Sequence, residues 1–290
     1  MSTTQDLRPA ATGQTARARP PKPTFFDFKP DRPGGALRTF VKRAILRTLD
    51  SGLAGVPRLD THVVICGFPR SGSTLLQLIV ESCYQGVRSY REEKSGVNAA
   101  RELRRTHSLM ITKKPSDLFL VDDIRAFYRG LHAQPRFVLT TRDPRAVLTS
   151  RYSGRALANT TRGPDGYVMS SEVWREWFTH FEYVSQGLDT LVVEFADLVK
   201  DPLSVQEHLS TFIGRAPDVP FDKFLDAVPE GFETKALNGV RSFDTSSLDR
   251  WREPKYRERI QQLLHEMPEL PALLVRLGYE ADAEWTREYA

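Results

Sequence analysis

The chain of 290 residues has little cysteine and no long apolar run. Cys66 and Cys83 are its only two cysteines, so a four-cysteine zinc site and a disulfide framework are both excluded. Nowhere do about 18 apolar residues follow one another, and the N-terminus lacks the charged, apolar and small-residue order of a signal peptide. We therefore expect a cytoplasmic protein in which both cysteines are small core residues.

The chain also lacks a strong excess of one charge. Its 41 lysines and arginines outnumber 37 aspartates and glutamates, which gives a formal net charge of +4. Because this excess is mild and forms no polybasic tail, it favours an anionic ligand, and we expect no nucleic-acid partner. The length allows one or two domains with a sizeable core.

An anion-binding loop is predicted at residues 67–74, which read Gly-Phe-Pro-Arg-Ser-Gly-Ser-Thr and follow the apolar run 62–66. The spacing is that of the phosphate-binding motif G-x-x-x-x-G-K-[ST], with both glycines and the threonine in register. Ser73 stands where the motif has lysine, and the positive charge lies earlier, at Arg70. Backbone N–H groups of such a loop converge on an anion at the start of a helix, which we expect Ser71 or Ser73 to cap.

The first 55 residues precede the predicted α/β domain. Residues 1–35 are rich in Pro, Thr, Arg and Gly and are predicted to be a disordered or loosely packed arm. Residues 36–55 are predicted to form a basic amphipathic helix and a linker. Its apolar face can lie on an anionic membrane, but such faces more often pack on their own domain, which we expect here. That face over residues 36–49 comprises Leu37, Phe40, Val41, Ala44, Ile45 and Leu49.

Residues 56–290 are predicted to form a single α/β domain of three layers, with a mostly parallel central sheet and a helical C-terminal part. Ligands of such sheets bind beyond the carboxyl ends of the strands. Strands are expected near 62–66, 108–112, 136–141 and 190–194. Helices are expected near 74–84, 95–105, 117–129, 144–152, 170–187, 202–213, 221–228, 253–265 and 269–277.

A second anion-binding segment follows the strand 136–141. Arg142 projects from the strand end, Pro144 suits the first turn of a helix, and Ser150 lies about two turns further on. An arginine and a serine in this arrangement can bind a phosphate. The sequence Arg-Asp-Pro on its own favours an ion pair at the start of a helix.

The two segments in this order resemble the sulfotransferases that use 3′-phosphoadenosine 5′-phosphosulfate (PAPS). In that family a loop P-[KR]-x-G-[ST]-[ST] holds the 5′-phosphosulfate and R-[DN]-P-x-x-x-x-x-S holds the 3′-phosphate. Residues 191–202 are similar to a further family segment, with Phe195 and Ala196 as departures, and residues 246–252 look like the loop that closes over the nucleotide. The resemblance covers about residues 60–280.

The resemblance implies which residues bind the donor and its product, 3′-phosphoadenosine 5′-phosphate (PAP). No metal is implied, because transfer of a sulfuryl group does not require magnesium held by Thr74. Trp251 either covers the adenine or packs in the core. The residues implied for the phosphosulfate are Arg70, Ser71, Gly72, Ser73 and Thr74. Those implied for the 3′-phosphate are Arg142 and Ser150, with Arg241 or Arg250 closing over it from the loop that precedes the last helices.

The resemblance also implies a general base. One branch of the family has a histidine after the second strand, which residues 111–115 lack; other branches have a glutamate shortly after the first helix. Glu92 is therefore our candidate, followed by Glu93, and His107 is a third acceptor for the proton. One of Lys113 and Lys114 is expected to contact the sulfuryl oxygens or to orient the base.

We thus expect transfer of a sulfuryl group from PAPS to a hydroxyl of a carbohydrate, glycolipid or secondary metabolite. One alternative is a P-loop-like nucleoside phosphotransferase or NTPase, for which Glu194 would have to hold magnesium. Another is a catalytically silent nucleotide-binding protein, or one that docks on a membrane through residues 36–49. The acceptor and the oligomeric state stay open, although 85–107 and 151–170 are expected to border the acceptor pocket.

Overall fold

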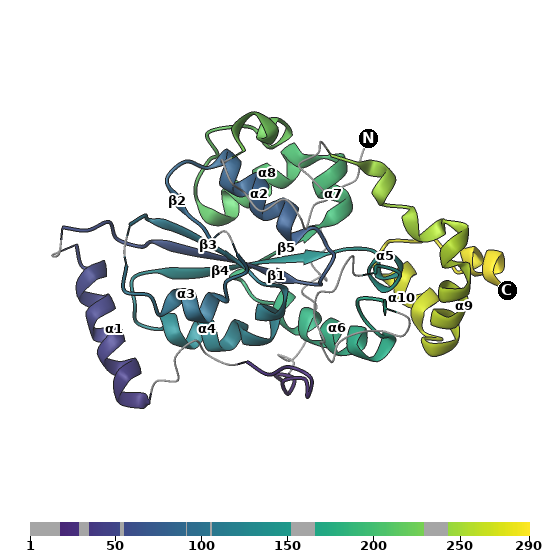
Figure 1. Ribbon diagram of the computed structural model, residues 1–290, viewed down its shortest axis with the longest axis horizontal. Coiled ribbons are helices and arrows are strands. Elements are labelled where there is room, and N and C mark those ends of the chain that lie inside the picture. Colours follow the sequence, from purple (N-terminus) through teal and green to yellow (C-terminus); the bar gives the residue numbers. More distant parts are fainter. Residues whose placement is uncertain are drawn as a thin grey trace.

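The computed structural model describes residues 18–28, 35–52, 55–90, 92–104, 106–151, 166–228 and 243–290. Within these residues, the strands form a parallel sheet in the order β2-β3-β1-β4-β5 (Figure 1). The predicted parallel α/β fold is therefore confirmed. The strands are β1 (Thr61–Gly67), β2 (Val87–Arg88), β3 (Leu109–Lys113), β4 (Gln134–Thr141) and β5 (Thr190–Glu194).

Helices cover both faces of the sheet (Figure 1). Alternate residues of β1 explain this: Val63 and Ile65 belong to the core on one face, Val64 and Cys66 to the core on the other. The first face is covered by α2 (Ser73–Cys83), α7 (Phe195–Lys200) and α8 (Pro202–Ile213), and the second by α3 (Gly96–Ala100), α4 (Val121–Tyr128) and α6 (Ser171–Ser185).

The carboxyl ends of the strands point toward the C-terminal part of the chain (Figure 1). That part is built from helices and turns, as predicted, and contributes to the larger core. None of the described helices is long and apolar enough to cross a membrane. The elements at this end are α5 (Pro144–Leu148), α9 (Arg257–Glu266), α10 (Leu270–Arg276) and the 3₁₀ turns Thr245–Ser247, Arg250–Arg252, Pro254–Tyr256 and Glu284–Tyr289.

Two predicted helices are shorter than expected. The helix expected over 95–105 ends at Ala100, and beyond it Arg88 of β2 binds the carboxylate of Glu102 and the carbonyl of Arg104, which holds this stretch beside the sheet edge. The helix expected over 144–152 ends at Leu148. There the hydroxyls of Thr149 and Ser150 donate to backbone carbonyls four residues back, an arrangement that tends to bend a helix.

The prediction for the amphipathic helix was right in its position and wrong in its packing. Helix α1 spans Ala36–Asp50, but most of its apolar face points away from the domain: Leu37, Phe40, Val41 and Ile45 are exposed. Of the expected face only Leu49 packs on the core, beside the fully buried Leu46. Within the N-terminal arm, the described residues 18–28 pack Phe25 and Phe26 against Phe119.

Candidate functional site

The loop between β1 and α2 has a backbone that only certain residues can adopt. Gly67 has φ 120°, and a Cβ there would lie 2.3 Å from the carbonyl oxygen of Thr140. Gly72 has φ 85°, and a Cβ there would lie 2.4 Å from the Phe195 ring. Between them Arg70, with φ 64°, is the single non-glycine residue of the described chain with a positive φ. Left-handed residues in such a turn direct neighbouring N–H groups toward one side, where they bind anions.

The serines of the loop do not cap α2 as predicted. The N-cap is Gly72, and within the described residues no side chain accepts a hydrogen bond there. The buried Ser71 hydroxyl instead contacts the carbonyl of Phe68 and, at 2.6 Å, the hydroxyl of Thr140, which ties the loop to β4. The N–H groups of the first turn, which contains Ser73 and Thr74, therefore stay available to a ligand.

Arg142 brings the second segment to this loop. It follows the carboxyl end of β4, donates from Nη1 to the carbonyl of Arg70 at 3.2 Å, and donates from Nη2 to the carbonyl of Ser247. Its guanidinium lies 4.4 Å from the centroid of the Phe195 ring, the same ring that faces Gly72. Strands β1 and β4 are neighbours, so the two sequence motifs meet at one edge of the sheet.

Two cations, Arg70 and Arg142, lie close together at this edge. Burial and, after it, the positive charge of Arg70 lower the pKa of Arg142 to about 10, while the carboxylates of Glu194 and Asp143 act in the opposite direction. The Nε atom of Arg142 is buried and has no hydrogen-bond partner in the described part of the chain. Because a buried donor without an acceptor is costly, this guanidinium is suited to an anionic ligand that supplies one.

The remaining residues predicted to bind the 3′-phosphate are placed differently. Ser150 lies just beyond α5, half-buried, and its hydroxyl donates to the carbonyl of Ala146. Arg250 is exposed and pairs with Asp244 at 3.1 Å. Arg241 lies outside the described residues, as do most of the residues 151–170 expected to border the acceptor pocket.

Trp251 belongs to the core, which decides between its two predicted roles. Its side chain is buried and packs against Trp285 and Tyr289. The guanidinium of Arg145 lies 3.7 Å from the centroid of its ring. Covering an adenine would require the ring to leave this cluster.

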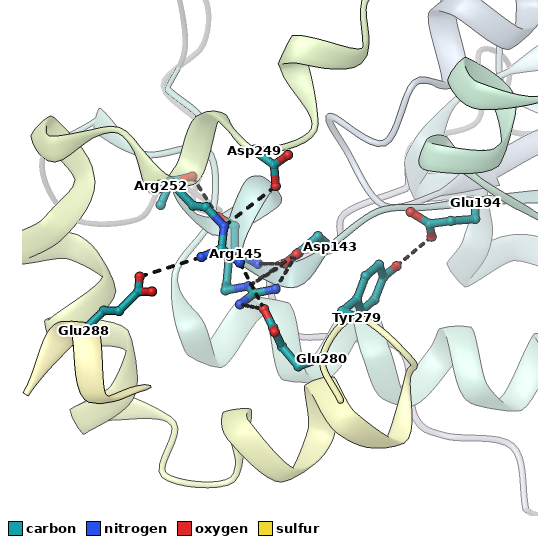
Figure 2. A network of polar contacts seen from close by, with 9 residues as sticks. Asp143, Arg145, Glu194, Asp249, Arg252, Tyr279, Glu280 and Glu288 are labelled. Atoms are coloured by element: carbon teal, nitrogen blue, oxygen red, sulfur yellow. Dashed lines mark hydrogen bonds and ion pairs between the residues drawn. The ribbon is translucent and has the colours of Figure 1, made fainter. Parts of the chain in front are cut away.

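A network of ion pairs around Arg145 fixes the end of β4 (Figure 2). The Arg145 side chain is 2% exposed and pairs with Asp143 at 2.8 Å and with Glu280. Asp143 also accepts a hydrogen bond from the Arg145 N–H and so caps α5. The helix-start ion pair considered for Arg-Asp-Pro thus exists, but it joins Asp143 to Arg145 and not to Arg142.

Glu194, at the end of β5, is engaged by two donors. Its side chain accepts a hydrogen bond from the Tyr279 hydroxyl at 2.6 Å (Figure 2). It accepts a second one from the Ala196 N–H at 3.4 Å. Burial raises its pKa to about 7. Each carboxylate oxygen thus accepts one hydrogen bond, and the two bonds hold the C-terminal segment and the start of α7.

A cavity of about 840 Å³ opens beside Arg142 at the carboxyl ends of β4 and β5. Its size is that of small-molecule pockets. It lies between the guanidinium of Arg142, the turn Thr245–Ser247 and the first turns after β5. The lining includes Arg142, Glu194, Asp197, Lys200, Thr245 and Ser246.

Among the candidates for the base and its lysine, one pair of residues is in contact. Lys113, the last residue of β3, is 7% exposed, and its Nζ atom lies 2.6 Å from Oε1 of Glu93. Glu92 is exposed and makes no hydrogen bond or ion pair with another described residue. Lys114 is half-buried and donates its backbone N–H to Ile65. The structure thus brings together Glu93 and Lys113, the second choice for the base and one of the two lysines.

His107 lies at the wrong end of the sheet to act as the base. It precedes β3, which runs parallel to β1, so it sits at the amino ends of the strands, whereas the loop follows their carboxyl ends. Its Nδ1 atom contacts the Thr106 hydroxyl at 2.8 Å.

A buried carboxyl that the sequence analysis missed anchors the segment of Glu93. Asp117 is fully buried and accepts hydrogen bonds from the Ser95 hydroxyl at 2.9 Å and from the Gly96 N–H at 2.6 Å. Burial raises its pKa to about 7. The end of β3 and the turn after it therefore hold the 93–96 stretch at two points, through Lys113 and through Asp117. An isolated aspartate carries no sequence signal for such a role.

Comparison with known proteins gives a family match and two distant structural likenesses. The model of the sulfotransferase domain matches residues 60–228, and the search of the curated proteins gave no match. The sulfotransferase domain from the Synechococcus PCC 7002 olefin synthase has a TM-score of 0.47 and 18% identity over 68% of this chain and 89% of that one. The domain from the curacin biosynthetic pathway has a TM-score of 0.45 and 19% identity over 72% of this chain and 98% of that one.

Proposed function

The chain belongs to the sulfotransferase domain family, and from this membership we propose that it transfers the sulfuryl group of PAPS to a hydroxyl group of a small-molecule or glycan acceptor. The matched residues include the loop 67–74, the Glu93–Lys113 pair and Arg142. Membership makes the protein a transferase. Beyond this membership, we propose PAPS as the donor and assign roles to single residues.

The environment of Arg142 is the observation that carries the proposal. Its guanidinium is held beside Arg70 with a buried Nε that lacks an acceptor within the described residues. A 3′-phosphate placed there would accept from Nε and compensate two positive charges. Because ATP has no 3′-phosphate, this position supports a 3′-phosphoadenosine ligand over a nucleoside triphosphate.

The loop supports binding of the 5′-phosphosulfate. Its left-handed turns and the uncapped first turn of α2 offer backbone N–H groups, and Ser73, Thr74 and Arg70 add side-chain donors. Such preorganised donors stabilise the negative charge that grows on the bridging oxygen as the S–O bond breaks. Arginine at position 70 stays charged near neutral pH, so its role is electrostatic.

We assign the general base to Glu93 and not to Glu92. The Glu93 carboxylate takes the proton of the acceptor hydroxyl while the acceptor oxygen bonds to sulfur and the bond from sulfur to the 5′-phosphate oxygen breaks. The products are a sulfate ester and PAP. Lys113 orients this carboxylate through its ion pair and adds a positive charge near the transferred group.

A phosphotransferase or NTPase fits the geometry less well. The loop has Ser73 in place of the lysine that contacts transferred phosphates, and the acid considered for magnesium, Glu194, already accepts from Tyr279 and Ala196. A catalytically silent protein would have no need of a carboxylate paired with a buried lysine at the site.

Transfer of labelled sulfuryl groups tests the proposed function. The protein is incubated with sulfur-labelled PAPS and a cell extract, and labelled small molecules and glycans are identified by mass spectrometry. We expect labelled acceptors with the wild type and with the control Arg287→Ala, which alters an exposed arginine of the last turn, but not with Arg142→Ala. Labelling that is equal in all samples, including one without protein, would contradict the proposal.

A further inference from the structure

Helix α1 is attached to the domain by its basic side. Arg43 donates to the carbonyl of Arg129, and Arg47 donates to the carbonyl of Gly130 at 3.1 Å. Lys42 reaches the carbonyl of Arg101 at 3.4 Å. Carbonyl groups just beyond the C-terminal ends of α3 and α4 thus accept hydrogen bonds from cationic side chains that would ordinarily face water.

The side of α1 that faces away from the domain is apolar. Leu37 is 77% exposed, Phe40 68%, Val41 47% and Ile45 40%. Their spacing places them on one continuous helical stripe. Within the described residues nothing covers this stripe, and large apolar groups concentrated on one exposed helix face mark an interaction surface.

The charge of α1 decides which partner fits. The helix contains four cations and a single acid, the buried Asp50, while Arg43 and Arg47 bond only carbonyls among the described residues, which leaves their charge in place. Arg38 is exposed beside the stripe. Two copies of this chain meeting through α1 would place like charges together, whereas an anionic lipid surface complements them.

We propose that α1 docks this protein on the surface of anionic phospholipid bilayers, with Leu37, Phe40, Val41 and Ile45 inserted between headgroups and Arg38, beside the stripe, contacting lipid phosphates. Figure 1 shows α1 at the opposite end of the molecule from α5, α9 and α10. A docked protein therefore keeps the carboxyl ends of its strands, and with them Arg142 and the loop 67–74, turned away from the bilayer. The membrane holds the enzyme while donor and acceptor enter from water.

Vesicle sedimentation with the full chain tests this inference. The probes are vesicles of phosphatidylcholine alone and of an equal mixture of phosphatidylcholine and phosphatidylglycerol. We expect binding to the mixed vesicles that salt weakens, and little binding to phosphatidylcholine alone. The triple variant Leu37→Ser, Phe40→Ser, Ile45→Ser should bind the mixed vesicles at least about 10-fold more weakly, because insertion of its apolar groups is lost.

A matched control removes three exposed leucines elsewhere: Leu188→Ser, Leu203→Ser, Leu225→Ser. It should bind vesicles like the wild type, and circular dichroism should show that both triple variants fold. The proposal is overturned if the wild type does not sediment with anionic vesicles, or if both triple variants bind equally. It is also overturned if ultracentrifugation shows a dimer that only the α1 variant dissociates, since a second copy then covers the stripe.

Discussion

Two neighbouring residues at the proposed anion site, Arg142 and Asp143, have different kinds of partner. Asp143 is bound to Arg145 and to the start of α5, and it makes no ion pair with Arg142. Arg142 therefore emerges from β4 with its charge uncompensated by an ion pair within the described residues, next to Arg70. A side chain that is positioned by backbone carbonyls and a ring, and not by a carboxylate, keeps its capacity for an anionic ligand.

The assignment of the base predicts different outcomes at two adjacent glutamates. Glu93→Gln should lower turnover by roughly 100-fold or more, because the amide cannot take the acceptor proton. Glu92→Gln, the matched control, should change turnover little, since this side chain is exposed without a described partner. Steady-state rates of sulfuryl transfer, with PAP affinity measured in parallel, check both. A large loss in Glu92→Gln with none in Glu93→Gln would return the base to Glu92.

Part of the site could be predicted from single residues and part could not. The loop 67–74 and Arg142 carry strong local patterns, and the structure places them together. The choice between Glu92 and Glu93 depends on which carboxylate reaches Lys113, a contact between residues 20 positions apart. Asp117 and Tyr279 act through tertiary contacts with no local pattern, so sequence reasoning had no means of finding them.

At the scale of elements, the loop depends on the space left by glycine. Gly72→Ala should lower the free energy of unfolding by about 2–4 kcal/mol, because it combines a left-handed backbone with a clash against Phe195. Gly214 follows α8 with φ 72°, and a Cβ there would have no neighbour within 4 Å. Gly214→Ala should therefore lower the free energy of unfolding by only about 1 kcal/mol. Urea unfolding of both variants measures the difference, and equal losses would show that the Phe195 contact does not constrain the loop.

Elements were predictable where periodicity and core packing agree. The four longer strands and the helices after β1 and β4 follow apolar patterns that the sheet requires. Strand β2 is only two residues long, and α7 begins directly after β5, so neither has a pattern of its own. In α1 the apolar periodicity is real, but it describes the exposed side, because carbonyls of α3 and α4 bind its cations.

At the scale of the whole molecule, two buried carboxyls make stability depend on pH. Burial raises the pKa of Glu194 and that of Asp117 to about 7, from 4.5 and 3.8. In the unfolded chain both ionise near their ordinary values, whereas in the folded chain they stay protonated to higher pH. Stability should therefore fall as pH rises from about 4 to about 7 and level off above it, by at most about 3 kcal/mol for Glu194 and about 4 kcal/mol for Asp117.

The variant Glu194→Gln isolates one of these contributions. The glutamine does not ionise, so the variant should gain free energy of unfolding relative to the wild type as pH rises from about 5 to about 8. Glu207→Gln, on an exposed position of α8, is the control and should keep the wild-type pH dependence. Chemical unfolding at several pH values measures all three proteins. A Glu194→Gln variant that parallels the wild type would mean that Glu194 is ionised in the folded protein across this range.

The central claim is that this molecule holds a 3′-phosphoadenosine ligand between the loop 67–74 and Arg142. Calorimetric titration in the presence of a magnesium chelator measures it directly, with PAP, adenosine 5′-monophosphate and ATP as ligands. We predict tight binding of PAP, binding of the monophosphate at least about 10-fold weaker because Arg142 has no phosphate to contact, and no tight binding of ATP. Tight ATP binding that requires magnesium, together with no response to PAP, would contradict the account.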